Sequence, residues 1–142
     1  MDGNAELLNF IYQNSQMGVD TIRQLIGVVD DKPLREQLKE EFQGYEEFHE
    51  AAKELLHERG YDEKGLGTLE KARTYFMINV QTICDSSASH IAEMLINGSS
   101  MGVVEAIQKY NEYENAEPEI RTLMDKLRKF EEHNIEKLKE FL

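Results

Sequence analysis

The residues with the clearest chemical potential are Glu46 and His49, three positions apart in a helix-forming stretch. Three residues is slightly less than one helical turn, so both side chains lie on the same side of the helix. A Glu-x-x-His pair ligates paired iron or manganese ions in carboxylate-bridged helical bundles. Later in the chain, Glu131 is the nearest counterpart of Glu46. One interpretation is therefore a metal site that uses Glu46, His49 and Glu131, with iron or manganese as the cofactor.

The other ligands that such a site needs are missing halfway along the first and fourth helical stretches. Two divalent cations require about four carboxylates that converge from four helices. Asp20 and Glu105 lie one turn further along, so either of them or a second chain would have to complete the set. The preferred interpretation is that His49 is a buried or half-buried structural imidazole and that Glu46 lies on the solvated side.

No other pattern in the chain points to catalysis. The sequence contains no Ser-His-Asp order and no phosphate-binding loop. The single cysteine, Cys84, lies near a helix C-terminus without a basic neighbour to lower its pKa, which favours a structural thiol over a nucleophile. We therefore expect no catalytic residue, and the sequence does not favour an enzyme.

Two copies of one helical hairpin are expected to position these residues. Residues of the first helical stretch recur 84 positions later. The pairs are Leu7/Ile91, Phe10/Met94, Ile11/Leu95, Ser15/Ser99, Met17/Met101, Gly18/Gly102 and Val19/Val103. In the next stretch the repeat distance is 85, with the pairs Pro33/Pro118, Leu38/Leu123, Phe42/Leu127, Tyr45/Phe130, Glu46/Glu131 and Glu47/Glu132. The sequence therefore predicts an internal duplication.

Apolar residues at three- and four-residue intervals, with only two prolines and no tryptophan, predict an all-α chain. At 142 residues it fits a single domain, 1–142. We expect hairpin one at residues 4–60, a short crossover helix at 68–84 and hairpin two at 88–142. Four long helices joined by one long connection are typical of a ferritin-like four-helix bundle. The predicted fold is thus a ferritin-like bundle of two duplicated hairpins with a crossover helix.

Residues that favour helix ends set the expected boundaries. Asn4 is predicted to cap the first helix, and Asp30 and Asn115 to cap the helices that begin near the two prolines. Gly60 is placed to end the second helix, and Thr68 to cap the crossover helix. The charged runs 35–41 and 126–139 are interpreted as solvated helix faces.

The charge of the chain limits its partners. A formal net charge of -12 argues against nucleic acid and against an anionic membrane surface. The uncharged runs 74–84 and 94–104 are shorter than the roughly 18 apolar residues that a membrane span needs. The first residues lack the basic start and apolar core of a signal peptide. We therefore expect a cytoplasmic protein with no nucleic-acid or membrane partner.

Two further features suggest binding. Small residues repeated in the first and fourth helices allow close packing, or they leave a pocket for a small apolar ligand. The expected pocket lining is Tyr12, Met17, Phe48 and Met101. Residues 74–104 carry only Asp85 and Glu93 as formal charges, although the whole chain is 31% charged. This stretch is not expected to face water on all sides, so we predict a homodimer.

The paired hairpins, the Glu46–His49 pair and the sequence Ser-His-Ile-Ala-Glu-Met-Leu-Ile-Asn-Gly-Ser-Ser-Met-Gly at residues 89–102 resemble uncharacterised ferritin-like bundle proteins of anaerobic Firmicutes. The likeness covers almost the whole chain and extends distantly to rubrerythrin-type domains. Members of that group that bind paired iron oxidise it, reduce peroxides or store metal. The resemblance implies the fold and carries over only Glu46 and His49, with Glu131 as a weak counterpart.

Taken together, the sequence favours a ferritin-like bundle without a complete di-metal site, which acts as a binding or interaction module. The alternative is a carboxylate-bridged iron or manganese protein, either an oxidoreductase or a metal-binding protein. The two interpretations differ in what the middle of the bundle contains.

Overall fold

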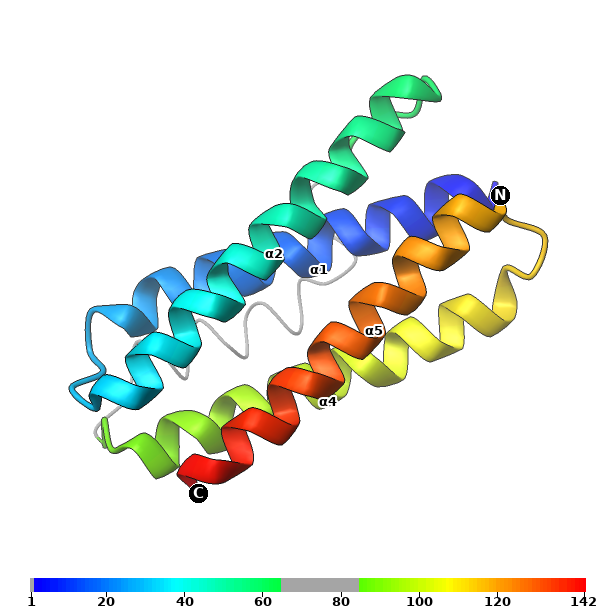
Figure 1. Cartoon of the computed structure of the whole chain (residues 1–142). Coiled ribbons are helices and arrows are strands. Elements are labelled where there is room, and N and C mark those ends of the chain that lie inside the picture. The colour runs from blue at the N-terminus through cyan, green and yellow to red at the C-terminus, as the bar shows by residue number, and fades with distance from the viewer. Residues whose placement is uncertain (1, 65–84) are drawn as a thin grey trace.

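Four long helices form the framework of the protein. The computed structural model describes residues 2–64 and 85–142. The helices are α1 (Gly3–Ile26), α2 (Lys32–Glu58), α4 (Ala88–Glu112) and α5 (Pro118–Leu138), followed by the short 3-10 helix η2 (Lys139–Phe141). Figure 1 shows α1 and α2 as one antiparallel hairpin and α4 and α5 as the other. An all-α bundle is thereby confirmed, whereas the expected crossover helix at 68–84 lies outside the described residues.

Aspartates cap the first two helices, at positions that differ from those expected. The side chain of Asp2 accepts a hydrogen bond from the backbone N–H of Asn4, at 2.9 Å. Asp31 does the same for the N–H of Leu34, also at 2.9 Å. The predictions of Asn4 and Asp30 as caps were therefore wrong. A capping side chain belongs to the residue directly before the first helical residue, from which it reaches the N–H groups two or three residues later, and Asp2 and Asp31 hold that position.

The other helix ends follow simpler rules. Ser87 caps α4 by accepting from the N–H of His90. Gly60 has a φ of +72°, the left-handed conformation expected for the residue that ends α2. Glu117, rather than the predicted Asn115, precedes the first residue of α5 and makes no side-chain capping bond there. The Glu117 carboxylate is free to make contacts elsewhere.

A polar clamp around Glu117 joins the two hairpins at one end of the bundle. The backbone N–H of Glu117 donates to the Asn4 side chain, and the Asn4 amide donates to the Glu117 carboxylate, both at 2.8 Å. Arg59, just after α2, donates to the same carboxylate at 2.7 and 3.0 Å. The starts of α1 and α5 and the end of α2 therefore meet at one end (Figure 1).

The core consists of two apolar clusters, one toward each end of the bundle. The cluster near the clamp contains Leu7, Leu8, Phe10, Ile11, Ala52, Leu55, Leu56, Ala106, Ala116, Ile120, Met124 and Leu127. The opposite cluster includes Val19, Ile22, Leu25, Val29, Leu34, Leu38, Ile91, Ala92, Leu95 and Leu138. Between them, each of the four helices contributes buried polar side chains. We call Asn14, Glu41, Tyr45, Ser99 and Glu131 the central polar layer.

The buried positions of the four helices allow the two proposed repeats to be compared residue by residue. In α1 and α4 the buried residues match at the expected distance of 84. In α2 and α5 the buried residues match at a distance of 86 residues, instead of the expected 85. The pairs buried in both helices are Leu34/Ile120, Leu38/Met124, Glu41/Leu127, Tyr45/Glu131 and Ala52/Leu138. Tyr45, not the exposed Glu46, therefore occupies the position equivalent to Glu131. The duplication itself stays a prediction.

Gly18 provides a direct test of the packing between α1 and α2. A Cβ atom at Gly18 would lie 2.6 Å from the Tyr45 ring, so Gly18→Ala forces the ring or the helix to move. We expect the free energy of unfolding to fall by about 1–3 kcal/mol. Urea unfolding followed by circular dichroism measures it.

The matched control is Gly27→Ala at the end of the same helix, where the nearest atom is 3.6 Å away and the backbone has a φ of -73°. This variant should be neutral or slightly stabilising, because alanine restricts the unfolded chain. Equal effects of the two substitutions would contradict the packing described for Gly18.

Candidate functional site

Within the central polar layer, Glu131 accepts hydrogen bonds from Asn14 and Tyr45. The Glu131 side chain is only 2% exposed and enters the bundle from α5. The amide of Asn14, on α1, donates to one carboxyl oxygen at 2.9 Å, and the hydroxyl of Tyr45, on α2, donates to the other at 2.9 Å. Ser99, on α4, borders the same small cavity as Tyr45 and Glu131. The Glu131 carboxyl thus joins side chains of α1 and α2 to α5, and Ser99 of α4 lies beside them.

Glycines make room for these groups. A Cβ atom at Gly102 would lie 2.8 and 3.1 Å from the two carboxyl oxygens of Glu131 and 3.2 Å from the Asn14 amide oxygen. A Cβ atom at Gly18 would likewise lie 2.6 Å from the Tyr45 ring. Each of the repeated glycines therefore admits a polar side chain from the other helix of its own hairpin. Gly18 on α1 admits Tyr45 of α2, and Gly102 on α4 admits Glu131 of α5. The sequence predicted close packing at both glycines without identifying what packs against them.

Glu41 is a second buried carboxyl in the same layer. It is 1% exposed, and Gln37 donates to one of its oxygens at 2.9 Å. The expectation that residues 35–41 form a solvated face is therefore wrong at Glu41. Its position was readable from the sequence, because Leu34, Leu38, Glu41 and Tyr45 follow the spacing of one buried helix stripe.

Burial, with no cationic side chain among the described residues beside them, shifts the pKa of both carboxyls. Burial raises the pKa of Glu131 to about 7, although the hydrogen bonds from Tyr45 and Asn14 lower it in part. The pKa of Glu41 is raised to about 8, chiefly by burial; the hydrogen bond from Gln37 lowers it in part, and the negative charges of Glu131 and Glu40 contribute to the rise. Two such carboxyls do not readily ionise together. The layer therefore holds at least one proton near neutral pH.

Tyr45 remains a hydrogen-bond donor under all ordinary conditions. Burial, together with the charges of Glu131 and Glu41, raises the pKa of its phenol well above the usual value. Its ring packs edge-on against Phe130, with ring centroids 5.0 Å apart. Since the phenol stays protonated, its bond to Glu131 is retained whether the carboxyl is charged or neutral.

A small cavity of about 30 Å³ adjoins the layer, with residues from all four helices around it. That volume accommodates about two water molecules and is too small for an organic ligand of ordinary size. Of the four residues expected to line an apolar pocket, only Met17 borders this cavity. Met101 is 49% exposed, while Tyr12 and Phe48 pack on the apolar cluster near the clamp.

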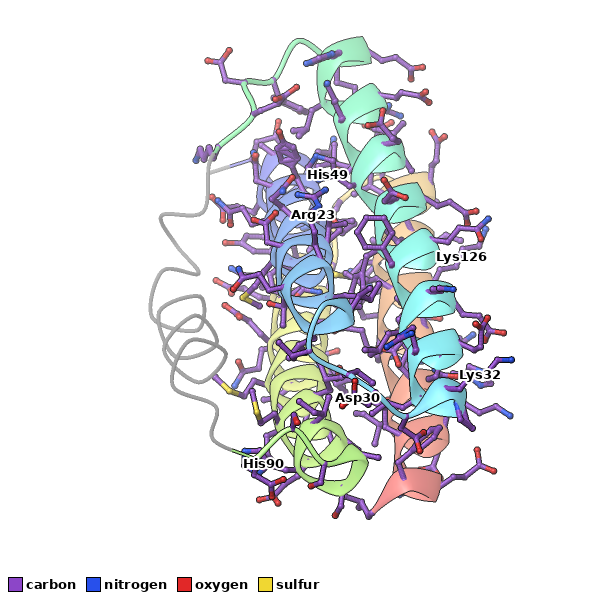
Figure 2. All side chains as sticks on the ribbon, turned by 90° about the vertical axis from the view of Figure 1, so that its left-hand side faces the viewer. Arg23, Asp30, Lys32, His49, His90 and Lys126 are labelled. Carbon is purple, nitrogen blue, oxygen red and sulfur yellow. The ribbon has the colours of Figure 1, made fainter. Side chains whose placement is uncertain are left out.

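The three candidate metal ligands have different surroundings. Glu46 is exposed, His49 is half-buried and Glu131 is buried. His49 lies on the side of α2 that faces α1 (Figure 2), stacked on Tyr12 with ring centroids 4.3 Å apart. Its Nδ1 atom is 3.3 Å from the carbonyl oxygen of Tyr12 and 3.5 Å from the hydroxyl of Ser15. This environment matches the structural role preferred for His49.

The residues proposed to complete the metal set are not drawn into the layer. Asp20 accepts a hydrogen bond from Gln16 at 2.8 Å and pairs with Arg23 at 3.7 Å. Glu105 is half-buried on α4, and burial raises its pKa. Within residues 2–64 and 85–142, no group of three or more His, Cys, Asp or Glu side chains is placed to hold a metal ion. The described side chains therefore do not fit a paired metal centre.

Comparison with known proteins finds no matching family model, no similar curated protein and no similar solved structure. Among the described helices, none is long and apolar enough to cross a membrane. The chemistry of the central polar layer must therefore be argued from its own geometry. That geometry supports proton binding by two buried carboxyls and hydrogen bonding across the bundle.

The raised pKa values of Glu131 and Glu41 predict how the free energy of unfolding depends on pH. An acid with a raised pKa in the folded state favours folding while it is protonated, and this contribution is lost as the pH rises through the folded-state pKa. We expect the free energy of unfolding to fall by about 1–3 kcal/mol between about pH 5 and about pH 8. Urea unfolding at several pH values measures this slope.

Glu131→Gln should reduce the slope, because the amide keeps the shape of the carboxyl but does not ionise, and the slope that remains belongs to Glu41. Glu46→Gln is the control, since Glu46 is exposed on the neighbouring helix and should leave the slope unchanged. Acids with lowered pKa values, such as Asp125, lose their contribution only below the ordinary pKa and do not enter this range. A slope that Glu131→Gln leaves intact would contradict the assignment.

Proposed function

We propose that the chain is a ferritin-like bundle of two duplicated hairpins that acts in the cytoplasm as a binding or interaction module. The observation that supports this function is the outward side of α4, where apolar side chains are exposed to solvent. Met101 is 49% exposed, Val104 55% and Ile107 40%. Single exposed apolar residues are ordinary, but a group of them on one helix face is typical of an interaction surface.

The outward side of α4 also lacks charge. We define the outer face of α4 as its exposed residues between two acidic positions, Glu93 and Glu112. These residues are Asn97, Ser100, Met101, Val104, Ile107, Gln108 and Asn111. The exposed sides of α2 and α5 are instead rich in charged residues, among them Lys32 and Lys126 (Figure 2). A surface that only faces water has no need to lack charged residues. A binding surface without charges avoids the free-energy cost of desolvating them.

A substitution at Val104 shows whether the outer face of α4 is free for binding or is covered by the rest of the same chain. If the outer face of α4 serves binding, Val104→Gln should change the free energy of unfolding of the monomer by less than about 0.5 kcal/mol. Unfolding is measured at protein concentrations low enough that the transition no longer depends on concentration. Val28→Gln, at another exposed apolar position, is the control for the substitution itself.

A loss of more than about 1 kcal/mol in Val104→Gln alone would contradict the proposed function. It would mean that the rest of the same chain packs on the face, so that the face is part of the core.

The alternative function, a carboxylate-bridged iron or manganese protein, makes a different prediction. Protein from cells supplied with both metals and purified without oxygen is analysed by mass spectrometry. The proposed function predicts a metal content near zero, equal in wild type and His49→Ala. Stoichiometric metal that is lost in His49→Ala would contradict it and establish the alternative. His49→Ala should in either case keep its helix content, which circular dichroism checks.

A further inference from the structure

We infer that the outer face of α4 binds the same face of a second copy of the chain, with the two helices antiparallel about a twofold axis at Val104. This inference rests on the proposed function and names the partner of the module. All residues of the face are exposed, and none carries a formal charge.

The order of residue types on the face is the same in both directions from Val104. A twofold axis at Val104 brings together positions whose numbers are equally far from 104. The facing pairs are Asn97/Asn111, Ser100/Gln108, Met101/Ile107 and Val104/Val104. A twofold interface must be complementary to itself, and here each apolar residue meets an apolar residue and each polar residue a polar one. The apolar pairs lie at the centre and the polar pairs at the ends, as in known interfaces.

The charged residues beside the face favour the antiparallel orientation. Glu93, Glu105 and Glu112 lie on α4 close to its outer face. In a parallel pair each of these would lie opposite its own copy, and like charges placed opposite one another are unfavourable. In the antiparallel pair Glu105 and Glu112 lie opposite Val103 and Ile96, which are uncharged, and Glu93 lies beyond the last residue of the second copy's α4.

The net charge of the chain limits which surface two copies can use to bind one another. At a formal net charge of -12, two copies repel one another through most of their surface. Contact through an uncharged face keeps the acidic faces of the two α2 helices apart. A groove of about 270 Å³ between α4 and α5, lined by Ile107, Tyr110 and Met124 among others, adjoins this face. It offers space for the Met101 side chain of the second copy, which lies opposite Ile107.

Cysteine cross-linking tests both the partner and the orientation. In a Cys84→Ser background, Val104→Cys should form a disulfide-linked dimer under mild oxidation, because this position faces itself at the axis. Asn97→Cys and Asn111→Cys should not cross-link alone, because each lies about 20 Å from its own copy along the helix axis. Mixed together, these two variants should form the mixed dimer. Mass spectrometry distinguishes the mixed species by mass.

Each outcome of the cross-linking has a defined meaning. The mixed dimer, without dimers of either variant alone, supports the antiparallel pair. Dimers of Asn97→Cys alone and of Asn111→Cys alone would indicate parallel helices and overturn the inference. The absence of any cross-link, with a monomeric wild type in sedimentation equilibrium at all concentrations, would also overturn it. The proposed function is judged separately, by the unfolding of the Val104→Gln monomer.

A charge at the axis provides a test without cysteine. Val104→Lys places two like charges opposite one another, so the dissociation constant of the dimer should rise by more than about tenfold. Val28→Lys adds the same charge at an exposed apolar position outside α4 and should leave the dimer intact. Sedimentation equilibrium measures both variants. Unchanged association of Val104→Lys would overturn the assignment of the face.

Discussion

The structure depends on one constraint, a carboxyl group buried in the middle of the bundle with no cation from residues 2–64 and 85–142 beside it. An ionised carboxylate in such a place is costly, so Glu131 requires donors, a proton or both. Asn14 and Tyr45 supply donors from the first hairpin, and Gly102 leaves the space that the carboxyl occupies. A shift of one hairpin along the other by one helical turn would bury Glu131 without these partners. The central polar layer therefore favours one register between the hairpins, a role that apolar packing alone fills poorly.

The α4 helix combines two uncharged faces with different roles. Its inner side presents small residues, Gly98, Ser99 and Gly102, toward the central polar layer. Its outer side presents apolar and amide side chains toward solvent. The inner side must be small because Glu131 and Tyr45 come from the opposite helices. The packing of the bundle sets no such requirement on the outer side, so the proposed interaction accounts for its apolar residues. One helix thus connects the packing of the bundle with its proposed interaction.

The sequence predicts the parts of this fold that follow from helical periodicity. The apolar stripes, the start of α4 and the end of α2 at Gly60 are confirmed, because each depends on local spacing or on a single conformational preference. The central polar layer was less predictable. Glu41 lies in a run of charged residues that resembles a solvated face, and only its place in the stripe of Leu38 and Tyr45 indicates burial. Glu131 was aligned with Glu46, although burial pairs it with Tyr45, because a one-residue shift in repeat distance is hard to detect when acidic residues are adjacent.

The central claim is that Glu131 and Glu41, buried with no cation beside them in the part of the chain that the structure describes, hold protons near neutral pH. Carbon-13 NMR titration of the side-chain carboxyls tests it most directly, with Glu131→Gln and Glu41→Gln to assign the two signals. The account predicts two glutamate signals that titrate well above the ordinary range, and each variant should remove one of them and shift the other toward lower pH. If every glutamate in the protein titrates near the ordinary value of about 4.3, the two carboxyls are solvated or paired with cations, and the account is contradicted.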